Sequence, residues 1–273
     1  MLKSKIVGKA KSLSQIQAVE TEFVKGLDKP DFMIIPKGGL TMIAGAGGIG
    51  KSFIALHLAI RYVLANPEKK ALLWLSEDLE GHTAGRFKAL WFSYYQDKHK
   101  KDFGAIHRIK TLGADIGAFD LDGLNSKEIQ ELFSDYDFIV LDPLITFAPP
   151  ATETDNQEAR KFMSRLISLA KDKDGVVIIH HISKTTADEV AKGNVDAHIT
   201  GRGSSDITNA MRLIYLVYKP IQKEGEELHI DTDTQRIARI AKDNWGVSKA
   251  LGTDELIVTI FPPASKSKSK SSK

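Results

Sequence analysis

The stretch "AGAGGIGKS", residues 44–52, decides the fold of this chain. It contains the pattern G-x-x-x-x-G-K-[ST] as Gly45, Gly50, Lys51 and Ser52. Backbone amides and a helix N-terminus cradle phosphate groups in such a loop. The apolar segment "LTMIAG" leads into it, and "KSFIALHLAIRYVLA" follows it with helical spacing. This strand–loop–helix order predicts a phosphate loop rather than a chance glycine-rich turn.

The loop predicts how a nucleoside triphosphate and Mg²⁺ would bind. Lys51 is expected to reach the β and γ phosphate oxygens, and the Ser52 hydroxyl to ligate Mg²⁺. The chain has no N-K-x-D guanine-specificity motif and no LSGGQ-like segment, which argues against a GTPase and a transporter-type ATPase. The expected nucleotide is therefore ATP. The expected nucleotide-binding residues are Gly45, Ala46, Gly47, Gly48, Ile49, Gly50, Lys51 and Ser52.

The composition indicates one folded main domain. The chain has 273 residues, of which 42% are hydrophobic and 27% are charged. It contains no cysteine, which excludes disulfides, thiolate metal sites and a cysteine nucleophile. No apolar run approaches the ~20 residues that a membrane span needs, and the N-terminus lacks the apolar core of a signal peptide. We expect a cytoplasmic protein.

The charge is unevenly distributed. The net charge is +3, but the tail "SKSKSKSSK" at 265–273 contains four of the 38 basic residues, which leaves 34 against 35 acidic residues elsewhere. The tail is expected to be disordered, as a solvated terminus or a weak polyanion-binding arm. Binding to nucleic acid would therefore depend on locally placed Lys and Arg.

Apolar runs and helical patterns alternate along the chain, which predicts an α/β fold with a mostly parallel central sheet. Strands are expected at 40–45, 69–78, 105–112, 137–143 and 175–183, with helices at 51–65, 84–102, 126–136 and 156–173. Further strands at 211–220, 227–233, 236–246 and 255–263 are expected to extend one side of the sheet. A short amphipathic helix is expected near 14–25.

Three strand ends contain candidate catalytic groups. Asp142 ends the buried run "FIVLDP" at the position of a Walker B carboxylate, a second Mg²⁺ ligand. Because Pro143 follows it instead of an acid, the base that activates water must lie elsewhere. Glu77 in "LLWLSED" is the preferred candidate and Asp78 the alternative, since open parallel sheets bind ligands at their carboxyl edge.

The run "VVIIHHISK" ends in His180 and His181. Neighbouring side chains of a strand point to opposite faces, so the two rings are poorly placed to chelate one metal. We expect His181 to face the phosphates as a sensor and His180 to face the packing of the sheet. The alternative is an ordinary hydrogen-bonded pair at the end of a strand.

The order of these motifs resembles the RecA/DnaB superfamily, and within it the RepA-type hexameric replicative DNA helicases of plasmids and phages. The matching blocks are "AGGIGKS", "SED", "IVLDP", "IIHHISK", "RGSS" at 202–205, Arg212 and "KDNWG" at 242–246. The resemblance implies a RecA-like core in a homohexamer, with ATP bound between subunits. It further implies an arginine supplied in trans, for which Arg212 is preferred and Arg202 is the alternative, with Lys242 as a possible second cation.

In this superfamily two loops hold DNA at the centre of the ring, here 145–160 and 183–203. The second loop contains Lys184, Lys192 and Arg202, which are suited to tracking the backbone of single-stranded DNA. The first loop is acidic, which departs from the expected pattern.

The expected domains are an N-terminal extension at 1–29, a RecA-like ATPase domain at 30–263 and a disordered tail at 264–273. The expected function is an ATP-dependent DNA helicase, with a primase or an initiator protein as a further partner. Two alternatives stay open: a RecA-like recombination or regulatory ATPase without unwinding, and a nucleotide-gated scaffold or loader.

Overall fold

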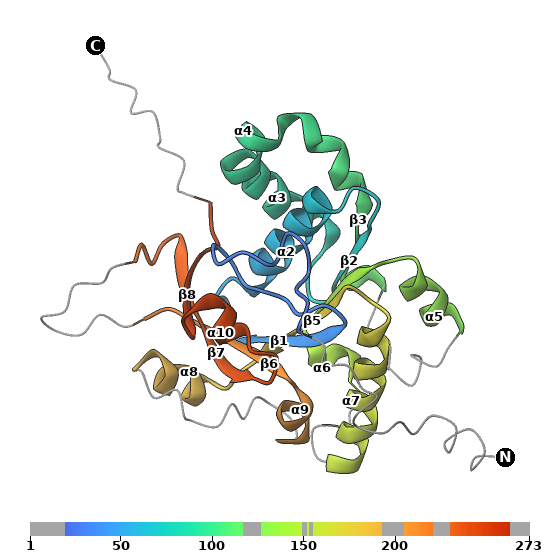
Figure 1. Cartoon of the computed structure of the whole chain (residues 1–273), viewed down its shortest axis with the longest axis vertical. Helices are drawn as coiled ribbons and strands as arrows, with labels where there is room; N and C mark the ends of the chain where they lie inside the picture. Colours follow the sequence, from blue (N-terminus) through green and yellow to red (C-terminus); the bar gives the residue numbers. More distant parts are fainter. Residues whose placement is uncertain are drawn as a thin grey trace, which may run out of the picture.

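The computed structural model describes residues 20–116, 127–148, 152, 155–192, 205–220 and 230–262. The described residues form an eight-stranded sheet in the order β3-β2-β4-β5-β1-β6-β7-β8 (Figure 1). The strands from β3 to β6 run parallel, and β7 and β8 continue one edge in antiparallel pairing. Their bounds are β1 Gly39–Gly45, β2 Ala71–Leu75, β3 Ile109–Leu112, β4 Phe138–Asp142, β5 Gly175–His181, β6 Leu213–Tyr218, β7 Gln235–Asp243 and β8 Glu255–Thr259.

Helices cover both faces of this sheet (Figure 1). The first face carries α2 (Lys51–Ala65), α3 (Glu80–Leu90), the π-helical turn η2 (Trp91–Tyr95), α4 (Gln96–His99), the 3₁₀ segment η3 (Lys100–Arg108) and α10 (Val247–Leu251). The second face carries α5 (Lys127–Ser134), α6 (Leu144–Phe147), α7 (Asn156–Lys171), α8 (Lys184–Ala191) and α9 (Ser205–Ala210). A short 3₁₀ turn, η4 (Ala114–Ile116), follows β3. No helix among the described residues is long and apolar enough to cross a membrane.

The continuous apolar runs of the central strands explain this layering. Every residue of β2 and β4 is buried. In β4, Phe138 and Val140 pack in the core on the α2 face, and Ile139 and Leu141 pack in the core on the α7 face. A strand with apolar side chains on both faces requires helices on both sides. The predicted α/β class, with a mostly parallel sheet extended by C-terminal strands, is confirmed.

The helix expected near 14–25 is wrong over its described part, because residues 20–25 are not helical. Phe23 forms an antiparallel bridge with Pro36, and the Val24 amide donates to the Ile35 carbonyl at 2.8 Å. Val24 and Leu27 are both buried in the core on the α2 face. Burial of these side chains outweighs the local helical pattern, so the folded body begins before residue 30. Residues 14–19 lie outside the described residues.

Three further local predictions differ from the structure. The strand expected at 105–112 begins only at Ile109, because η3 occupies 100–108. In the strand expected at 227–233, the described residues 230–233 form a turn in which the carboxylate of Asp231 accepts from the Asp233 amide and from the Thr234 hydroxyl. The second DNA loop begins with a helix, α8, where Ser183 Oγ accepts from the Thr186 amide at 3.1 Å.

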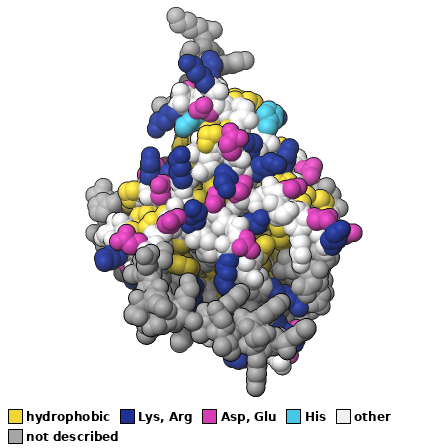
Figure 2. Space-filling view, turned by 45° about the vertical axis from the view of Figure 1, so that its right-hand side comes forward, with side chains coloured by type: hydrophobic (Ala, Val, Ile, Leu, Met, Phe, Trp, Pro, Cys, Tyr) yellow, Lys and Arg dark blue, Asp and Glu magenta, His cyan; other side chains and the backbone are white. Residues whose placement is uncertain are grey.

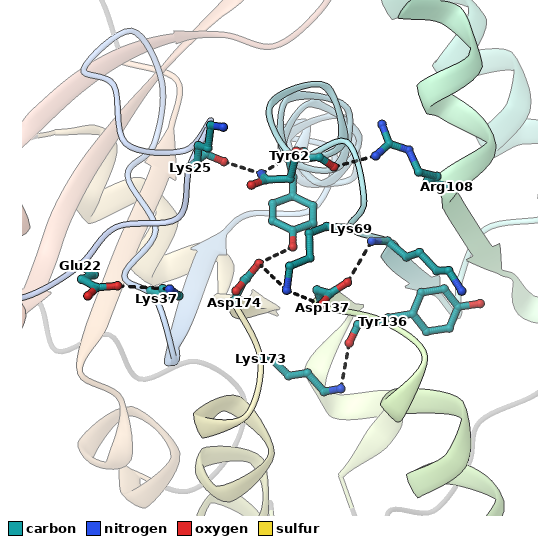
Figure 3. A network of polar contacts seen from close by, with 12 residues as sticks. Glu22, Lys25, Lys37, Tyr62, Lys69, Arg108, Tyr136, Asp137, Lys173 and Asp174 are labelled. Atoms are coloured by element: carbon teal, nitrogen blue, oxygen red, sulfur yellow. Dashed lines mark hydrogen bonds and ion pairs between the residues drawn. The ribbon is translucent and has the colours of Figure 1, made fainter.

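A polar network fastens α2 to the amino ends of β4 and β5 (Figure 3). The Tyr62 hydroxyl donates to Asp174 Oδ2 at 2.6 Å. The Lys69 ammonium lies 2.7 Å from Asp137 Oδ1 and 3.7 Å from Asp174 Oδ2. Burial and the Asp174 carboxylate hold the pKa of Tyr62 well above its usual value, so its hydroxyl stays a donor. The network stabilises the end of the sheet that is opposite the phosphate loop.

Replacing Tyr62 with Phe is expected to lower the free energy of unfolding by about 1.5–3 kcal/mol, because it removes a hydrogen bond to a charged group. Chemical denaturation measures this change. Tyr136→Phe is the control, since the Tyr136 hydroxyl has no hydrogen-bond partner among the described residues (Figure 3). Equal effects of the two substitutions would contradict a stabilising role for the Tyr62–Asp174 bond.

Candidate nucleotide-binding site

The phosphate loop connects the buried strand β1 to the first turn of α2. Gly48 and Gly50 both have positive φ, 73° and 106°. A Cβ atom on Gly50 would lie 2.8 Å from Ile260 Cγ2 and 2.8 Å from Phe261 Cζ. Position 50 therefore requires glycine both for its backbone conformation and for the close approach of the chain that follows β8.

Lys51 is held in the loop by its own backbone. Its side chain is buried, and its ammonium donates to the carbonyls of Gly45 at 2.9 Å and Ala46 at 2.7 Å. Burial lowers the pKa of Lys51 to about 8, while the carboxylates of Asp142 and Glu77 act in the opposite direction. These carbonyls hold the ammonium at the inner edge of the loop, where a phosphate-bearing ligand would meet it.

Ser52 and Asp142 lie together at the carboxyl ends of the strands. Ser52 Oγ donates to Asp142 Oδ2 at 2.9 Å. Asp142 is buried, and burial raises its pKa to about 6, against the lowering effects of the Ser52 bond and of Lys51. Loop and Walker B strand thus bring together two oxygen groups of the kind that Mg²⁺ binds. Among the described residues, no cluster of three or more His, Cys, Asp or Glu side chains could hold a metal alone.

His181 lies between Lys51 and Glu77. Its Nδ1 is 3.3 Å from the Lys51 ammonium, and its Nε2 is 3.5 Å from Glu77 Oε2. Glu77 is 62% exposed, so its carboxylate is accessible to solvent. His180 points to the opposite face, where it is buried, and burial lowers its pKa to about 4. The two histidines therefore lie on the faces expected from strand alternation.

Asp78 has a different partner from Glu77. Its carboxylate forms an ion pair with Arg86 of α3, and the Arg86 guanidinium lies 5.9 Å from the centre of the Phe53 ring. Phe53 in turn meets Phe261 edge-on, with ring centroids 5.1 Å apart. Sequence reasoning missed Arg86, Phe53 and Phe261, because none belongs to a motif. The only available signal was the position of Phe53 directly after Ser52.

These side chains enclose a cavity of about 250 Å³. Its lining residues are Gly48, Gly50, Lys51, Ser52, Phe53, Glu77, Asp78, Arg86, Asp142, His181 and Phe261. An adjoining cavity of about 530 Å³ shares Glu77 and His181 and reaches His180 and Ile145 on the other face of β5. The expected catalytic and phosphate-binding groups thus share one cavity, with the exception of the arginines.

Arg212 is exposed and lies at the opposite end of the sheet from the phosphate loop. It precedes β6, in which Leu213 pairs with Thr41 of β1 and Val217 pairs with Gly45. Five strand positions, roughly 16 Å, therefore separate Arg212 from the loop. The side chain cannot reach phosphates bound in its own chain. Arg202 lies outside the described residues.

Lys242 has partners within its own chain. Its ammonium donates to the carbonyls of Thr208 at 3.2 Å and Asn209 at 2.9 Å, at the C-terminal end of α9. Burial and the nearby Arg212 lower the pKa of Lys242. The structure thus places this cation as a cap on the helix that precedes Arg212.

The candidate DNA-binding residues are only partly described. Lys184 is the first residue of α8, and Lys192 follows that helix, is exposed and lies 3.1 Å from Glu189. In the first loop, Arg160 pairs with Asp206 of α9 at 3.0 Å and Lys161 pairs with Glu158 at 2.6 Å. These cations lie on the α7 face of the sheet.

The fold and this cavity together define a RecA-like phosphate-loop ATPase. A sequence profile of the AAA domain family matches residues 10–187, about two thirds of the chain. The chain belongs to this AAA domain family. No curated protein matches it.

Among solved structures, 793 chains match this fold. One of them is the ATPase domain of a helicase, with a TM-score of 0.54 and 17% sequence identity over 76% of this chain and 78% of that chain. At this identity the likeness concerns the fold. The particular activity must therefore be argued from the residues of the site.

Proposed function

We propose that this protein is an ATP-driven DNA helicase, a ring-shaped homohexamer that translocates on single-stranded DNA in plasmid or phage replication. The observation that carries the proposal is the position of His181, within 3.3 Å of Lys51 and 3.5 Å of Glu77. The imidazole ring closes a path from the nucleotide cavity into β5, and β5 leads directly into α8 and Lys192. A change in phosphate charge would reach this surface through one residue.

The side chains of the cavity fit MgATP. Lys51 would bind the terminal phosphates, and Ser52 and Asp142 would hold Mg²⁺, which supplies charge neutralisation on the phosphate oxygens. Mg²⁺ usually takes one or two protein oxygens and completes its shell with phosphates and water. The Ser52–Asp142 pair, which is 2.9 Å apart, has this composition.

Glu77 is the proposed general base. Its exposed carboxylate is accessible to water at the carboxyl edge of β2, whereas the Asp78 carboxylate is bound by Arg86. A base must keep a free oxygen for the proton that it removes. The ammonium of Lys51 and the ring of His181 would orient the Glu77 carboxylate toward the cavity.

The cavity needs a further cation, which supports assembly into a ring. Lys51 and Arg86 are the cations that line it among the described residues, and Asp78 neutralises Arg86. Arg212 is exposed at the far end of the sheet, so it can act on phosphates only in a neighbouring subunit. An arginine supplied in this way stabilises the charge that develops on the transferred phosphoryl group.

DNA binding would depend on local cations in this ring. On the face shown in Figure 2, Lys and Arg side chains alternate with Asp and Glu over the described surface, so this face has no broad basic field. The proposed contacts are Lys184, Lys192 and Arg202, which lie in the segment after the sensor strand. Backbone contacts of this kind bind single strands without reading bases.

One observation favours a second candidate, a regulatory ATPase that binds DNA without unwinding it. The cations of the first loop are engaged within the chain, since Arg160 pairs with Asp206 and Lys161 with Glu158. Fewer free cations imply weaker binding to DNA. Such a protein would hydrolyse ATP slowly and leave duplexes intact.

A forked-duplex assay separates these candidates. With a nonhydrolysable ATP analogue, the protein is expected to form hexamers, as measured by mass photometry. Single-stranded DNA should stimulate ATP hydrolysis, and ATP should drive displacement of a labelled strand from the fork. Lys51→Ala is the inactive control. Hexamers that show DNA-stimulated hydrolysis without strand displacement would favour the regulatory ATPase, and hexamers with neither activity would contradict both.

A further inference from the structure

A separate cavity of about 680 Å³ lies beside α2, between α2 and the Tyr94–His99 segment. We call it the α2–α4 cavity. It shares no lining residue with the two cavities at the phosphate loop. Its volume falls within the range of small-molecule sites, roughly 300–1,000 Å³. The proposed ATPase reaction uses none of its residues.

The inner wall of the α2–α4 cavity is made of rings. Phe32, His57 and Tyr95 are all buried, and their ring centroids lie 5.4 Å (Phe32–His57) and 5.7 Å (His57–Tyr95) apart. His57 Nε2 donates to the Ile260 carbonyl at 3.1 Å, so Nδ1 is the acceptor for the Tyr95 hydroxyl at 2.7 Å. Burial lowers the pKa of His57 to about 4, which keeps the ring neutral. An uncharged aromatic wall suits a planar ring.

The rim of the cavity is cationic. Lys29 and Lys98 are exposed there, and neither ammonium has an ion-pair partner among the described residues. Arg61 pairs with Asp31 at 2.6 Å, yet its Nε is buried and has no hydrogen-bond partner in the part of the chain that the structure describes. A buried donor without an acceptor costs free energy. Three cations against one carboxylate suit an anionic ligand.

The same wall touches the phosphate loop through the chain after β8. The Tyr94 hydroxyl donates to the Phe261 carbonyl, and His57 donates to the Ile260 carbonyl. Ile260 and Phe261 are the residues that approach Gly50, and Phe261 also lines the nucleotide cavity. A ligand that moves the rings of Tyr94 or His57 therefore moves a wall of the nucleotide cavity.

We propose that the α2–α4 cavity is an effector site for a phosphate-bearing small molecule with a planar ring, of about mononucleotide size. The ring packs on Phe32 and Tyr95, and the phosphates bind Lys29, Lys98 and Arg61. Binding changes turnover at the phosphate loop through Ile260 and Phe261.

ADP binding to the full chain tests the site without requiring hydrolysis. Lys51→Ala removes the main phosphate contact of the loop, and calorimetry is expected to show one remaining ADP per protomer. Adding Lys29→Glu and Lys98→Glu should weaken this binding by about tenfold or more, because two rim cations become anions. Lys110→Glu reverses an exposed lysine outside the cavity and should leave the affinity unchanged.

The outcomes are decisive for the site. Loss of all ADP binding in Lys51→Ala, or residual binding that Lys29→Glu and Lys98→Glu leave unchanged, overturns it. Inorganic pyrophosphate is the second probe: binding as tight as that of ADP would overturn the part of the proposal that concerns the ring. A protein without helicase activity could still pass this titration, so the failure of the proposed function is distinguishable.

A kinetic measurement tests the link to the phosphate loop. ADP that binds only at the phosphate loop competes with ATP and raises KM alone. In the wild type, ADP is expected to change kcat as well, and this change should disappear in the Lys29→Glu/Lys98→Glu variant while KM still rises. An effect of ADP on kcat that is equal in both proteins would contradict the link.

Discussion

Replacing Glu77 with Gln is expected to reduce the kcat of ATP hydrolysis by about 10²–10⁴-fold, the usual contribution of a general base. Gln keeps the size of the side chain but cannot accept the proton of the attacking water. The affinity for ATP should stay close to that of the wild type, because Lys51, Ser52 and Asp142 are unchanged. Single-turnover hydrolysis and ATP titration measure the two quantities separately.

Two neighbouring acids serve as controls for Glu77. Glu80→Gln changes an exposed acid at the start of α3 and should leave hydrolysis unaffected. Asp78→Asn breaks the ion pair with Arg86, so it should weaken ATP binding more than it slows single-turnover hydrolysis. If Asp78→Asn instead abolished turnover at saturating ATP while Glu77→Gln did not, the assignment of the base would be reversed.

Replacing Arg212 with Ala is expected to reduce the rate of hydrolysis by about 10³–10⁵-fold, the range known for arginines supplied to a phosphoryl-transfer site. Arg212 is exposed and lies roughly 16 Å along the sheet from the loop of its own chain, so the loss must arise at a neighbour's nucleotide. ATP binding by isolated protomers should be unaffected. Arg239→Ala is a control at an arginine of β7 that pairs with Asp254 and Glu255.

Mixing two inactive variants tests whether Arg212 acts in trans. A Lys51→Ala subunit has a damaged loop but an intact Arg212, and an Arg212→Ala subunit has the reverse. Where they adjoin in the correct order, one interface combines an intact loop with an intact arginine. Hydrolysis should therefore recover in the mixture and follow the fraction of such interfaces. Mixed hexamers without any recovery would show that Arg212 acts within its own chain or has no catalytic role.

The sequence was most informative where one local pattern determines the structure. The predicted strand before the phosphate loop and the helix at 51–65 agree with β1 and α2, because the glycines of the loop and the apolar runs beside it leave little choice. Asp142, Glu77 and His181 could be brought to one edge because parallel strands place their carboxyl ends together. Their chemical roles stay predictions.

The parts that sequence reasoning missed depend on contacts between distant segments. Arg86 reaches Asp78 only because α3 folds back over β2, and Phe261 meets Gly50 from the other end of the sheet's chain order. The helix expected near 14–25 failed for the same reason, since pairing of Val24 with Ile35 determines the backbone there. Lys242 gave no local sign that it would cap α9.

The contact between Gly50 and the Ile260–Phe261 segment has a consequence for the order of folding. The loop at residues 45–52 belongs to the first strand and helix of the sheet, yet one of its walls comes from the segment after the last strand. During synthesis the loop therefore emerges long before the residues that complete it. Contacts with such large sequence separation form late and slowly. Nucleotide binding then reports that the whole sheet, including β7 and β8, has assembled, and a truncated chain that ends before β8 would lack this wall of the site.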